Sequence, residues 1–293
     1  MQPVRPSPLD ILQQPVALKP VAGKEPQTMQ EPEFQHLKIE RTGHIATVTF
    51  DRPEKSNALN YAHLAEIEAA AHAFRDDVET RVVIFTGAGK HFSSGADLSD
   101  PGSAYQVPLS LRRRRARIGE RAIDALCDID QITIAAWNGA AMGGGACIAT
   151  ALDFRIGADD CFMQYPEVDI GVNLMWKSLP LIVHLTGPAR AKQLVAGGAR
   201  INAEKLLEWG VLDELVPREA LLSSAFTLAE RYVDKPPVAV QMIKRSINQV
   251  VSALDRAVMH MDADQNLFAQ TSGDRDEAIR AYLAKEKPTF TGD

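Results

Sequence analysis

The stretch Trp137–Asp153, WNGAAMGGGACIATALD, places three consecutive glycines between two apolar runs. Glycine inside a regular element costs about 0.5–1 kcal/mol relative to alanine, because it loses more backbone freedom on folding. The run therefore indicates that the chain needs bare backbone at Gly143, Gly144 and Gly145. Three explanations compete: a phosphate-binding loop, close packing of the backbone against a neighbour, and a backbone site for an oxyanion.

The phosphate-loop explanation is disfavoured by the spacing of the motif. GAAMGGGACIA lacks the Lys-Ser/Thr pair of a Walker loop and the GxGxxG pattern of a dinucleotide turn. The other two explanations stay open. An apolar helix predicted over 144–152 would begin where the backbone is bare, and the first N–H groups of a helix lack intrahelical partners at the positive end of its dipole. A carbonyl oxygen could reach them only if no Cβ intervened.

The segments around the glycines alternate between strand, glycine turn and helix. Strands are predicted for β-branched or apolar runs at 44–50, 80–89, 131–140 and 153–159. The period of the apolar residues predicts a helix over 61–76, and most of the chain after residue 188 is predicted to be helical. This alternation predicts an α/β fold. Residues 1–33 are rich in proline and show no period, which is typical of a flexible tail.

Composition excludes several classes of protein. The 293-residue chain has a formal charge of −6 and a pI of about 5.7, which argues against a nucleic-acid or membrane-surface role. No apolar run reaches the roughly 18 residues of a membrane span. The three cysteines show no CxxC spacing and the N-terminus shows no secretory signal, so we expect a cytoplasmic protein without disulfides.

Five segments, in this order and spacing, together resemble the enoyl-CoA hydratase/isomerase (crotonase) superfamily. They are RPEKSNALN (52–60), HFSSGADL (91–98), WNGAAMGGGACIATALDFRIGADD (137–160), PEVDIGV (166–172) and GPARAKQLVAGGARINAEKLLEWGVLDELVP (187–217). The resemblance runs from about residue 37 to residue 290. It implies a crotonase-like spiral of ββα units over 34–200, which holds the coenzyme A and catalytic site. It also implies a helical region over 201–293 that contacts coenzyme A and joins chains into a homotrimer or a hexamer.

The resemblance also implies how the site works. The substrate is an acyl-CoA thioester, with coenzyme A as part of the substrate and no tightly bound cofactor. The backbone N–H groups of Ala96 and Gly144 would bind the thioester oxygen, and Glu167 would be a catalytic carboxylate. The chain departs from the hydratases of the family at Cys147, where they have a second glutamate.

This departure leaves three functions open. With one carboxylate, Glu167 can move a proton between two carbons, so we favour double-bond isomerisation of an enoyl-CoA. A hydratase would need a substitute acid, and Asp169 would share a face with Glu167 if the segment were extended. A non-catalytic acyl-CoA-binding protein is the third function. Cys147 would be a reactive thiol if its helix position lowered its pKa, or else a small buried side chain.

Further residues are expected to contact the substrate. Met175 and Trp176 lie in an apolar segment that would line the acyl pocket, and Met175 occupies a position where some relatives carry a carboxylate. Tyr282 and Lys285 match a C-terminal segment that approaches the nucleotide. The full set of expected contacts is Arg52, Ser94, Asp97, Gly143, Met175, Trp176, Tyr282 and Lys285. The histidines show no metal-ligand spacing, so no metal is expected.

Overall fold

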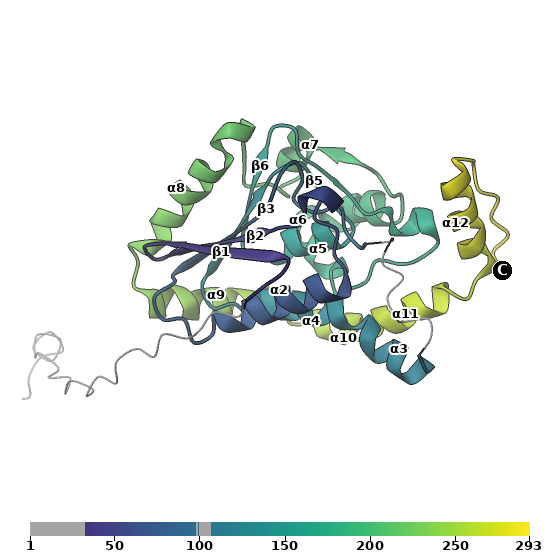
Figure 1. The fold of residues 1–293 in the computed structure, drawn as a ribbon, viewed down its shortest axis with the longest axis horizontal. Coiled ribbons are helices and arrows are strands. Elements are labelled where there is room, and N and C mark those ends of the chain that lie inside the picture. The colour runs from purple at the N-terminus through teal and green to yellow at the C-terminus, as the bar shows by residue number, and fades with distance from the viewer. Residues whose placement is uncertain (1–32, 98, 100–106) are drawn as a thin grey trace, which may run out of the picture. The chain divides into compact units, whose positions relative to one another are not determined.

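A six-stranded mixed sheet forms the centre of the fold in this computed structural model, which describes residues 33–97, 99 and 107–293. Apart from residue 33, the expected N-terminal tail lies outside the described residues. The first two strands are antiparallel, and every later neighbour in the sheet is parallel (Figure 1). In spatial order the strands are β1 (Leu37–Thr42), β2 (Ile45–Phe50), β3 (Val82–Gly87), β4 (Ile132–Trp137), β6 (Phe154–Ala158) and β9 (Glu214–Val216).

A smaller three-stranded sheet follows the glycine-rich stretch. It contains β5 (Ala140–Met142), β7 (Phe162–Gln164) and β8 (Ile201–Asn202), with β5 and β7 parallel and β7 and β8 antiparallel. Its first strand ends at Met142, directly before Gly143. The small sheet therefore fixes where the glycine run begins.

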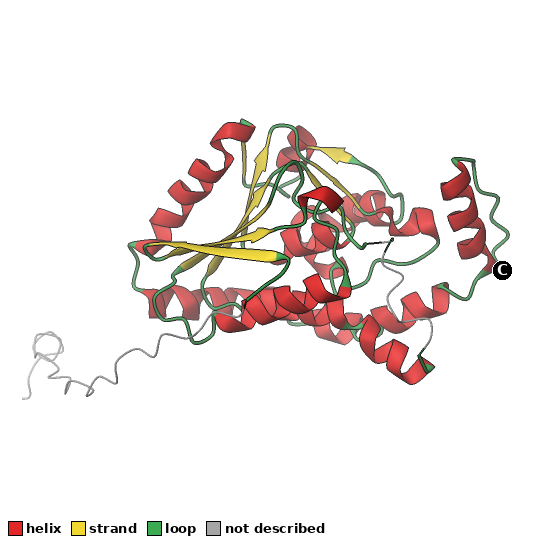
Figure 2. Ribbon diagram, viewed as in Figure 1, coloured by secondary structure: helices red, strands yellow, loops and turns green. Residues whose placement is uncertain are grey.

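Helices cover both faces of the large sheet (Figures 1 and 2). Side chains alternate along each strand, so Val83 and Phe85 join one hydrophobic cluster while Val82 and Ile84 join another. The first cluster includes buried residues of α2 (Tyr61–Ala73), α4 (Ile118–Cys127) and α5 (Gly144–Ala151). The second includes residues of α8 (Leu221–Val233). Helix α5 is thus buried inside the first cluster, with its N-terminus at the glycine run.

The remaining helices surround this centre. Helix α6 (Leu179–Val195) bends at Gly187, whose φ of 76° and ψ of 167° interrupt the helix before Pro188. The other helices are α3 (Leu109–Ala116), α7 (Ala203–Glu208), α9 (Pro237–Val251), α10 (Asp255–Met259), α11 (Asp262–Ala269) and α12 (Gly273–Ala284). Short 3₁₀ turns lie at Pro53–Lys55, Pro166–Ile170 and Arg218–Ala220. In the described part of the chain, none of these helices combines the length and the apolar character that crossing a bilayer requires.

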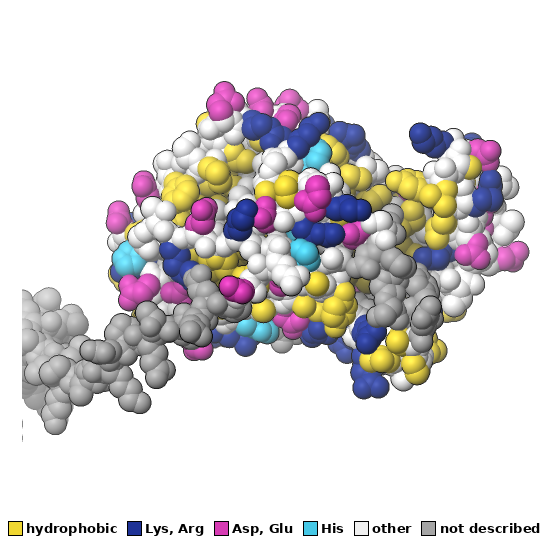
Figure 3. Space-filling model, viewed as in Figure 1, with side chains coloured by type: hydrophobic (Ala, Val, Ile, Leu, Met, Phe, Trp, Pro, Cys, Tyr) yellow, Lys and Arg dark blue, Asp and Glu magenta, His cyan; other side chains and the backbone are white. Residues whose placement is uncertain are grey.

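The α/β prediction is confirmed, and so is each of the four predicted strands, within a few residues. The predicted helix over 61–76 ends earlier, at Ala73, and the helix over 144–152 forms as predicted. The segment after Tyr165 is a 3₁₀ turn, whereas an extended segment was considered from the sequence. Strand β9 and helix α8 come from the segment 201–293, yet they pair with β6 and pack on the large sheet. Basic and acidic side chains are interspersed on the face in Figure 3.

Candidate active site

The three glycines at the start of α5 each lie against a different neighbour. A Cβ on Gly143 would lie 2.6 Å from Oε1 of Glu167, and one on Gly144 would lie 2.1 Å from Cζ3 of Trp176. A Cβ on Gly145 would lie 2.5 Å from the carbonyl oxygen of Ser93. At Gly144 and Gly145 the indole ring and the Ser93 backbone exclude a side chain. At Gly143 the close atom is the end of a flexible side chain, and the φ of 46° is what favours glycine. Close packing therefore accounts for Gly144 and Gly145, and backbone conformation accounts for Gly143.

The Ala96 backbone lies beside the start of α5. A Cβ on Gly95 would lie 3.3 Å from the Gly144 nitrogen and 2.5 Å from the Met142 oxygen. Gly95 O accepts from Leu59 N and Asp97 N donates to Leu59 O, so Leu59 and Ala96 form a parallel bridge. In such a bridge the N–H of the central residue points away from its partner strand. The Ala96 N–H therefore faces away from Leu59 and, within the described residues, donates no hydrogen bond.

The first N–H groups of α5 are equally available. Gly143 N donates to Gln164 O at 2.9 Å, and the first intrahelical bond runs from Cys147 N to Gly143 O at 3.0 Å. The Gly144 N–H lies between these two, at the positive end of the helix, where an intrahelical acceptor does not exist. The Ala96 segment thus lies beside the Gly144 nitrogen, and the role of the two N–H groups at a thioester oxygen stays a prediction.

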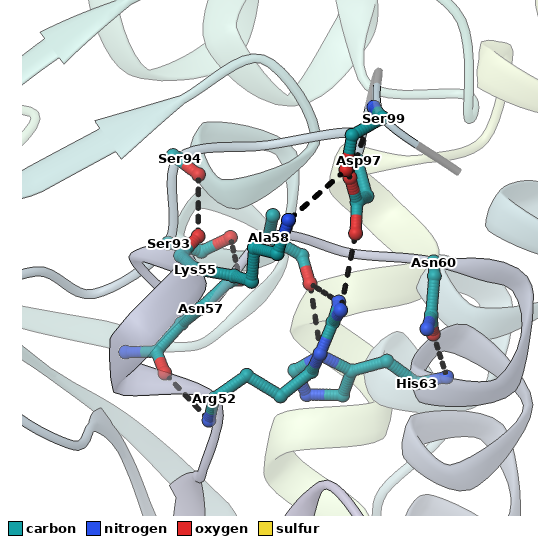
Figure 4. A network of polar contacts seen from close by, with 10 residues as sticks. All are labelled: Arg52, Lys55, Asn57, Ala58, Asn60, His63, Ser93, Ser94, Asp97 and Ser99. Atoms are coloured by element: carbon teal, nitrogen blue, oxygen red, sulfur yellow. Dashed lines mark hydrogen bonds and ion pairs between the residues drawn. The ribbon is translucent and has the colours of Figure 1, made fainter. Parts of the chain in front are cut away.

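A polar network holds the Ala96 segment in place (Figure 4). Arg52 bonds Asp97 at 3.1 Å, and the two side chains are only 12% and 6% exposed. Hydrogen bonds from Ser99 and Arg52 hold the pKa of Asp97 below its usual value. Ser94 N donates to Ser56 O at 2.9 Å. Arg52 and Asp97 bind each other and tie residues 52–60 to residues 93–97, and their contact with the substrate stays a prediction.

Glu167 lies in the 3₁₀ turn Pro166–Ile170, with its carboxylate against Gly143. Its Oε2 atom is buried and has no hydrogen-bond partner within the described residues. Burial raises the pKa of Glu167 to about 7, and the charge of Asp169 adds to the rise. A carboxyl group that titrates near neutral pH beside two free N–H donors is suited to move a proton at a polarised carbonyl.

The two substitute groups considered from the sequence do not share this place. Since the segment is a 3₁₀ turn, Asp169 does not lie on the face of Glu167; it is exposed, and a Cβ on Gly198 would lie 3.0 Å from its Oδ2. Cys147 is only 1% exposed, and burial together with the charge of Glu167 raises the pKa of its thiol well above the usual value. The shift is opposite to the one expected from the helix position. Cys147 is a small buried side chain.

Trp176 closes the other side of the glycine run. Its ring lies between α5 and α4, because a Cβ on Gly119 would also lie 2.1 Å from its Nε1. Trp176 and Lys177 have φ values of 65° and 55°, a conformation that costs about 1–3 kcal/mol at each non-glycine residue. Met175 is partly buried and packs against the main core. Trp176 thus fills the space beside Gly144. This position fits an acyl-pocket side chain, and it equally fits an ordinary core side chain.

Tyr282 and Lys285 lie at the C-terminal end of α12. Tyr282 is 63% exposed on α12, and Lys285 follows at the C-terminal end of that helix with a φ of 56°. Helix α12 packs on the turn that carries Glu167, since a Cβ on Gly171 would lie 2.7 Å from the Arg275 Cα. The two residues stay predicted coenzyme A contacts.

Two buried carboxyl groups were missed by the sequence reasoning. Glu120 on α4 is 2% exposed and Asp262 at the start of α11 is 1% exposed. Lys177 N donates to Asp262 Oδ2 at 2.6 Å, which places this pair behind the Trp176 turn. An acid on the apolar face of the helix IGERAIDALC was the available signal for Glu120. The described residues contain no group of three side chains suited to hold a metal ion.

Comparison with known proteins gives one consistent result. The family model of enoyl-CoA hydratase/isomerase matches residues 40–293. A crotonyl-CoA hydratase of Syntrophomonas wolfei is 32% identical over 261 residues, which cover 88% of this chain and 98% of that protein. A carnitinyl-CoA dehydratase of Citrobacter koseri is 34% identical over 271 residues, covering 88% and 99%.

Solved structures show the same fold. The enoyl-CoA hydratase of Bacillus anthracis has a TM-score of 0.70 at 28% identity, covering 88% of this chain and all of that one. A monofunctional enoyl-CoA isomerase of M. smegmatis has a TM-score of 0.63 at 28% identity, covering 74% and 94%. Both a hydratase and an isomerase therefore share the arrangement of two mixed sheets and C-terminal helices.

Proposed function

Since the chain belongs to the enoyl-CoA hydratase/isomerase family, we propose that it moves the double bond of an enoyl-CoA thioester, with Glu167 as the only base. The chain is an enzyme of the hydratase/isomerase type with the crotonase fold. The observation that carries the choice of reaction is the pairing of one carboxylate, Glu167 against Gly143, with a buried thiol at Cys147.

The proposed reaction begins at the thioester carbonyl. The N–H groups of Ala96 and Gly144 donate to its oxygen and stabilise the negative charge that develops there, and each such donor typically contributes about 10²–10³ in rate. Ionised Glu167 takes a proton from C2 of a 3-enoyl-CoA, which leaves a dienolate. The resulting carboxylic acid returns the proton to C4, so the double bond moves to C2–C3 and Glu167 is ionised again.

The raised pKa of Glu167 supports both halves of this cycle. At a pKa of about 7, the ionised base and the protonated acid lie close in free energy at neutral pH. The buried Oε2 atom without a partner is free to accept the proton. One carboxyl group can therefore serve as base and then as acid.

Hydration of a 2-enoyl-CoA is the second candidate, and the curated relatives favour it. The S. wolfei protein is a crotonyl-CoA hydratase and the C. koseri protein a carnitinyl-CoA dehydratase. Hydration needs a group that orients water as well as one that moves the proton. Asp169 faces Gly198 and Cys147 is a buried thiol, so neither provides the second carboxylate beside Glu167.

Product analysis of wild type and Glu167→Gln separates the two reactions. The purified enzyme would be given crotonyl-CoA and a 3-enoyl-CoA separately, and the products would be resolved by chromatography and NMR. We expect 2-enoyl-CoA from the 3-enoyl substrate, lost in the variant, and no 3-hydroxyacyl-CoA. A 3-hydroxyacyl-CoA product formed faster than the isomer would replace this proposal with hydration.

We further propose that copies of the chain assemble through α9 and α10 into a trimer or a pair of trimers. These helices carry large exposed apolar side chains in the single chain: Val238, Met242, Ile243, Ile247, Val250, Val251 and Val258. Many exposed apolar side chains on two consecutive helices are typical of an interface. Light scattering of the whole chain tests the assembly, and a monomer would contradict it. We place the enzyme in the cytoplasm, on the expectation drawn from its three unpaired cysteines.

A further inference from the structure

Glu120 and Asp262 form a buried carboxyl pair behind the candidate site. Glu120 Oε2 accepts from Arg117 Nε at 2.8 Å, and Asp262 Oδ2 accepts from Lys177 N at 2.6 Å. The other oxygens, Glu120 Oε1 and Asp262 Oδ1, are buried, and no donor group reaches them from the described residues. Glu120 is one of the groups that raise the pKa of Asp262, so the two buried carboxyl groups lie close enough to interact.

Two carboxylates cannot bond each other, because an ionised carboxylate only accepts hydrogen bonds. A bond between Glu120 and Asp262 exists only if one of them carries a proton. Arg117 already balances a negative charge on Glu120, whereas Asp262 receives neutral backbone N–H groups, from Lys177 and Ala263, and no cation. The proton therefore belongs on Asp262. Burial and the neighbouring Glu120 raise the pKa of Asp262 to about 7.

The pair is connected to the candidate site through one turn. Lys177 N, which bonds Asp262, follows directly after Trp176, and both residues have left-handed φ values. Gly119, the residue before Glu120, contacts the Trp176 ring from the other side. Such a strained turn persists only where its surroundings hold it. The contacts therefore run from the carboxyl pair to the turn, then to the indole ring, and then to Gly144.

We propose that Glu120 and Asp262 share one proton and, as positioning residues, lock the Trp176–Lys177 turn that presses the indole ring onto Gly144. The effect of this lock on turnover rests on the proposed function, whereas the lock itself does not depend on that function. Asp262 lies on α11, so the pair also couples the C-terminal helices to the N-terminus of α5.

Other charged groups surround the pair and set the conditions for a test. Asp264 on α11 bonds Arg113, and Lys177 Nζ bonds Asp124 of α4. Arg113, Arg117, Cys147 and Lys177 interact with the pair directly, and Asp124, His260 and Asp264 interact with the pair's neighbours. Above neutral pH, the loss of the shared proton leaves two facing carboxylates, whose repulsion should loosen the turn. Since Glu167 titrates in the same range, the test must not depend on it.

Fluorine NMR of the whole chain, labelled with 5-fluorotryptophan, tests the lock without substrate. The chain has three tryptophans, and the Trp176 resonance is assigned by its loss in Trp176→Phe. In the Glu167→Gln background we expect this resonance to move with pH, with a midpoint near 7. Adding Asp262→Asn should abolish the movement, because its amide can donate to Glu120 and still accept from Lys177 N.

Two further variants complete the design. Glu120→Gln should move the midpoint of the Trp176 resonance to lower pH, because the new amide can donate to ionised Asp262; this variant covers the case in which Asp262→Asn does not fold. Asp264→Asn, on the same helix but half-buried and paired with Arg113, should leave the midpoint of the Glu167→Gln background unchanged. A Trp176 resonance that ignores pH in the Glu167→Gln background, or one that moves alike with and without Asp262→Asn, would overturn the proposal. Neither outcome bears on whether the enzyme isomerises or hydrates.

Discussion

The indole ring of Trp176 packs on Gly144 so closely that a Cβ on this glycine would lie 2.1 Å from Cζ3 of the ring. The same glycine supplies one of the two neighbouring N–H groups that we assign to the thioester oxygen. The absence of a Cβ at Gly144 therefore serves both the packing of the Trp176 ring and the proposed binding of the thioester oxygen. A substitution at this position tests both.

Gly144→Ala should destabilise the fold by about 1–3 kcal/mol, the usual cost of an overpacked core, and should lower kcat as the first turn of α5 moves. Trp176→Phe removes the ring atoms that the new Cβ would meet, so the double variant should recover part of the stability. Urea denaturation measures both effects. Gly273→Ala is the matched control, because its Cβ would lie 3.7 Å from the nearest atom. Strictly additive losses in the double variant would argue against this contact.

Glu167→Gln should lower kcat by about 10²–10⁴, the range typical of general acid–base catalysis, and leave the fold intact. In the wild type, kcat/KM should rise as pH increases through about 7 and then level off, because the base must be ionised. A pH–rate profile with a 3-enoyl-CoA measures this. A profile that levels off below pH 5 would contradict the raised pKa.

The same carboxyl group should make stability depend on pH. Glu167 binds its proton more tightly in the folded chain, where its pKa is about 7, than in the unfolded chain, where it is about 4.5. Its stabilising contribution is therefore complete below pH 4.5 and is lost as pH rises through 7. Comparing urea midpoints of wild type and Glu167→Gln at several pH values should show the wild type losing stability relative to the variant over this interval. An unchanged difference between the two would speak against the buried carboxyl.

Cys147 should be inert. Because burial raises the pKa of its thiol, iodoacetamide should leave it unlabelled in the folded enzyme and label it after unfolding. Cys147→Ala should keep kcat within a few-fold of wild type. Peptide mapping by mass spectrometry distinguishes it from the half-buried Cys127. Rapid labelling of Cys147 in the native state, with loss of activity, would restore the reactive-thiol interpretation.

Arg52→Met should cost about 1–3 kcal/mol, because it leaves the Asp97 carboxylate with only its hydrogen bonds from Ser99. Since this ion pair holds the Ala96 segment, we also expect kcat to fall more than KM rises. Arg218→Met is the matched control: its ion pair with Asp160 is exposed and should contribute less than about 1 kcal/mol. Equal losses of stability in the two variants would contradict a special role for Arg52.

Local patterns in the sequence predicted much of this molecule. Alternating β-branched residues predicted the strands, and the bare backbone before an apolar run predicted the start of α5 at Gly144. Close contacts between distant segments were not predictable in this way. The partners of the three glycines, Glu167, Trp176 and Ser93, come from separate places along the chain, and only the fold brings them together.

Ion pairs and other contacts of charged residues were also not predictable from local patterns. The sequence suggested that Arg52 and Asp97 contact the substrate, but it did not predict that these residues, 45 positions apart, bind each other. Likewise, the partners Glu120 and Asp262 belong to α4 and α11, which are far apart in sequence. Side-chain type predicts that a charge needs a partner, but it does not predict which one.

In the proposed reaction, Glu167 alone carries one proton from C2 to C4. A 3-enoyl-CoA with deuterium at both C2 positions, turned over in ordinary water, tests it most directly. We expect 2-enoyl-CoA with part of the deuterium at C4, no 3-hydroxyacyl-CoA, and loss of the product in Glu167→Gln. A 3-hydroxyacyl-CoA as the main product, or isomerisation that persists in Glu167→Gln, would contradict it.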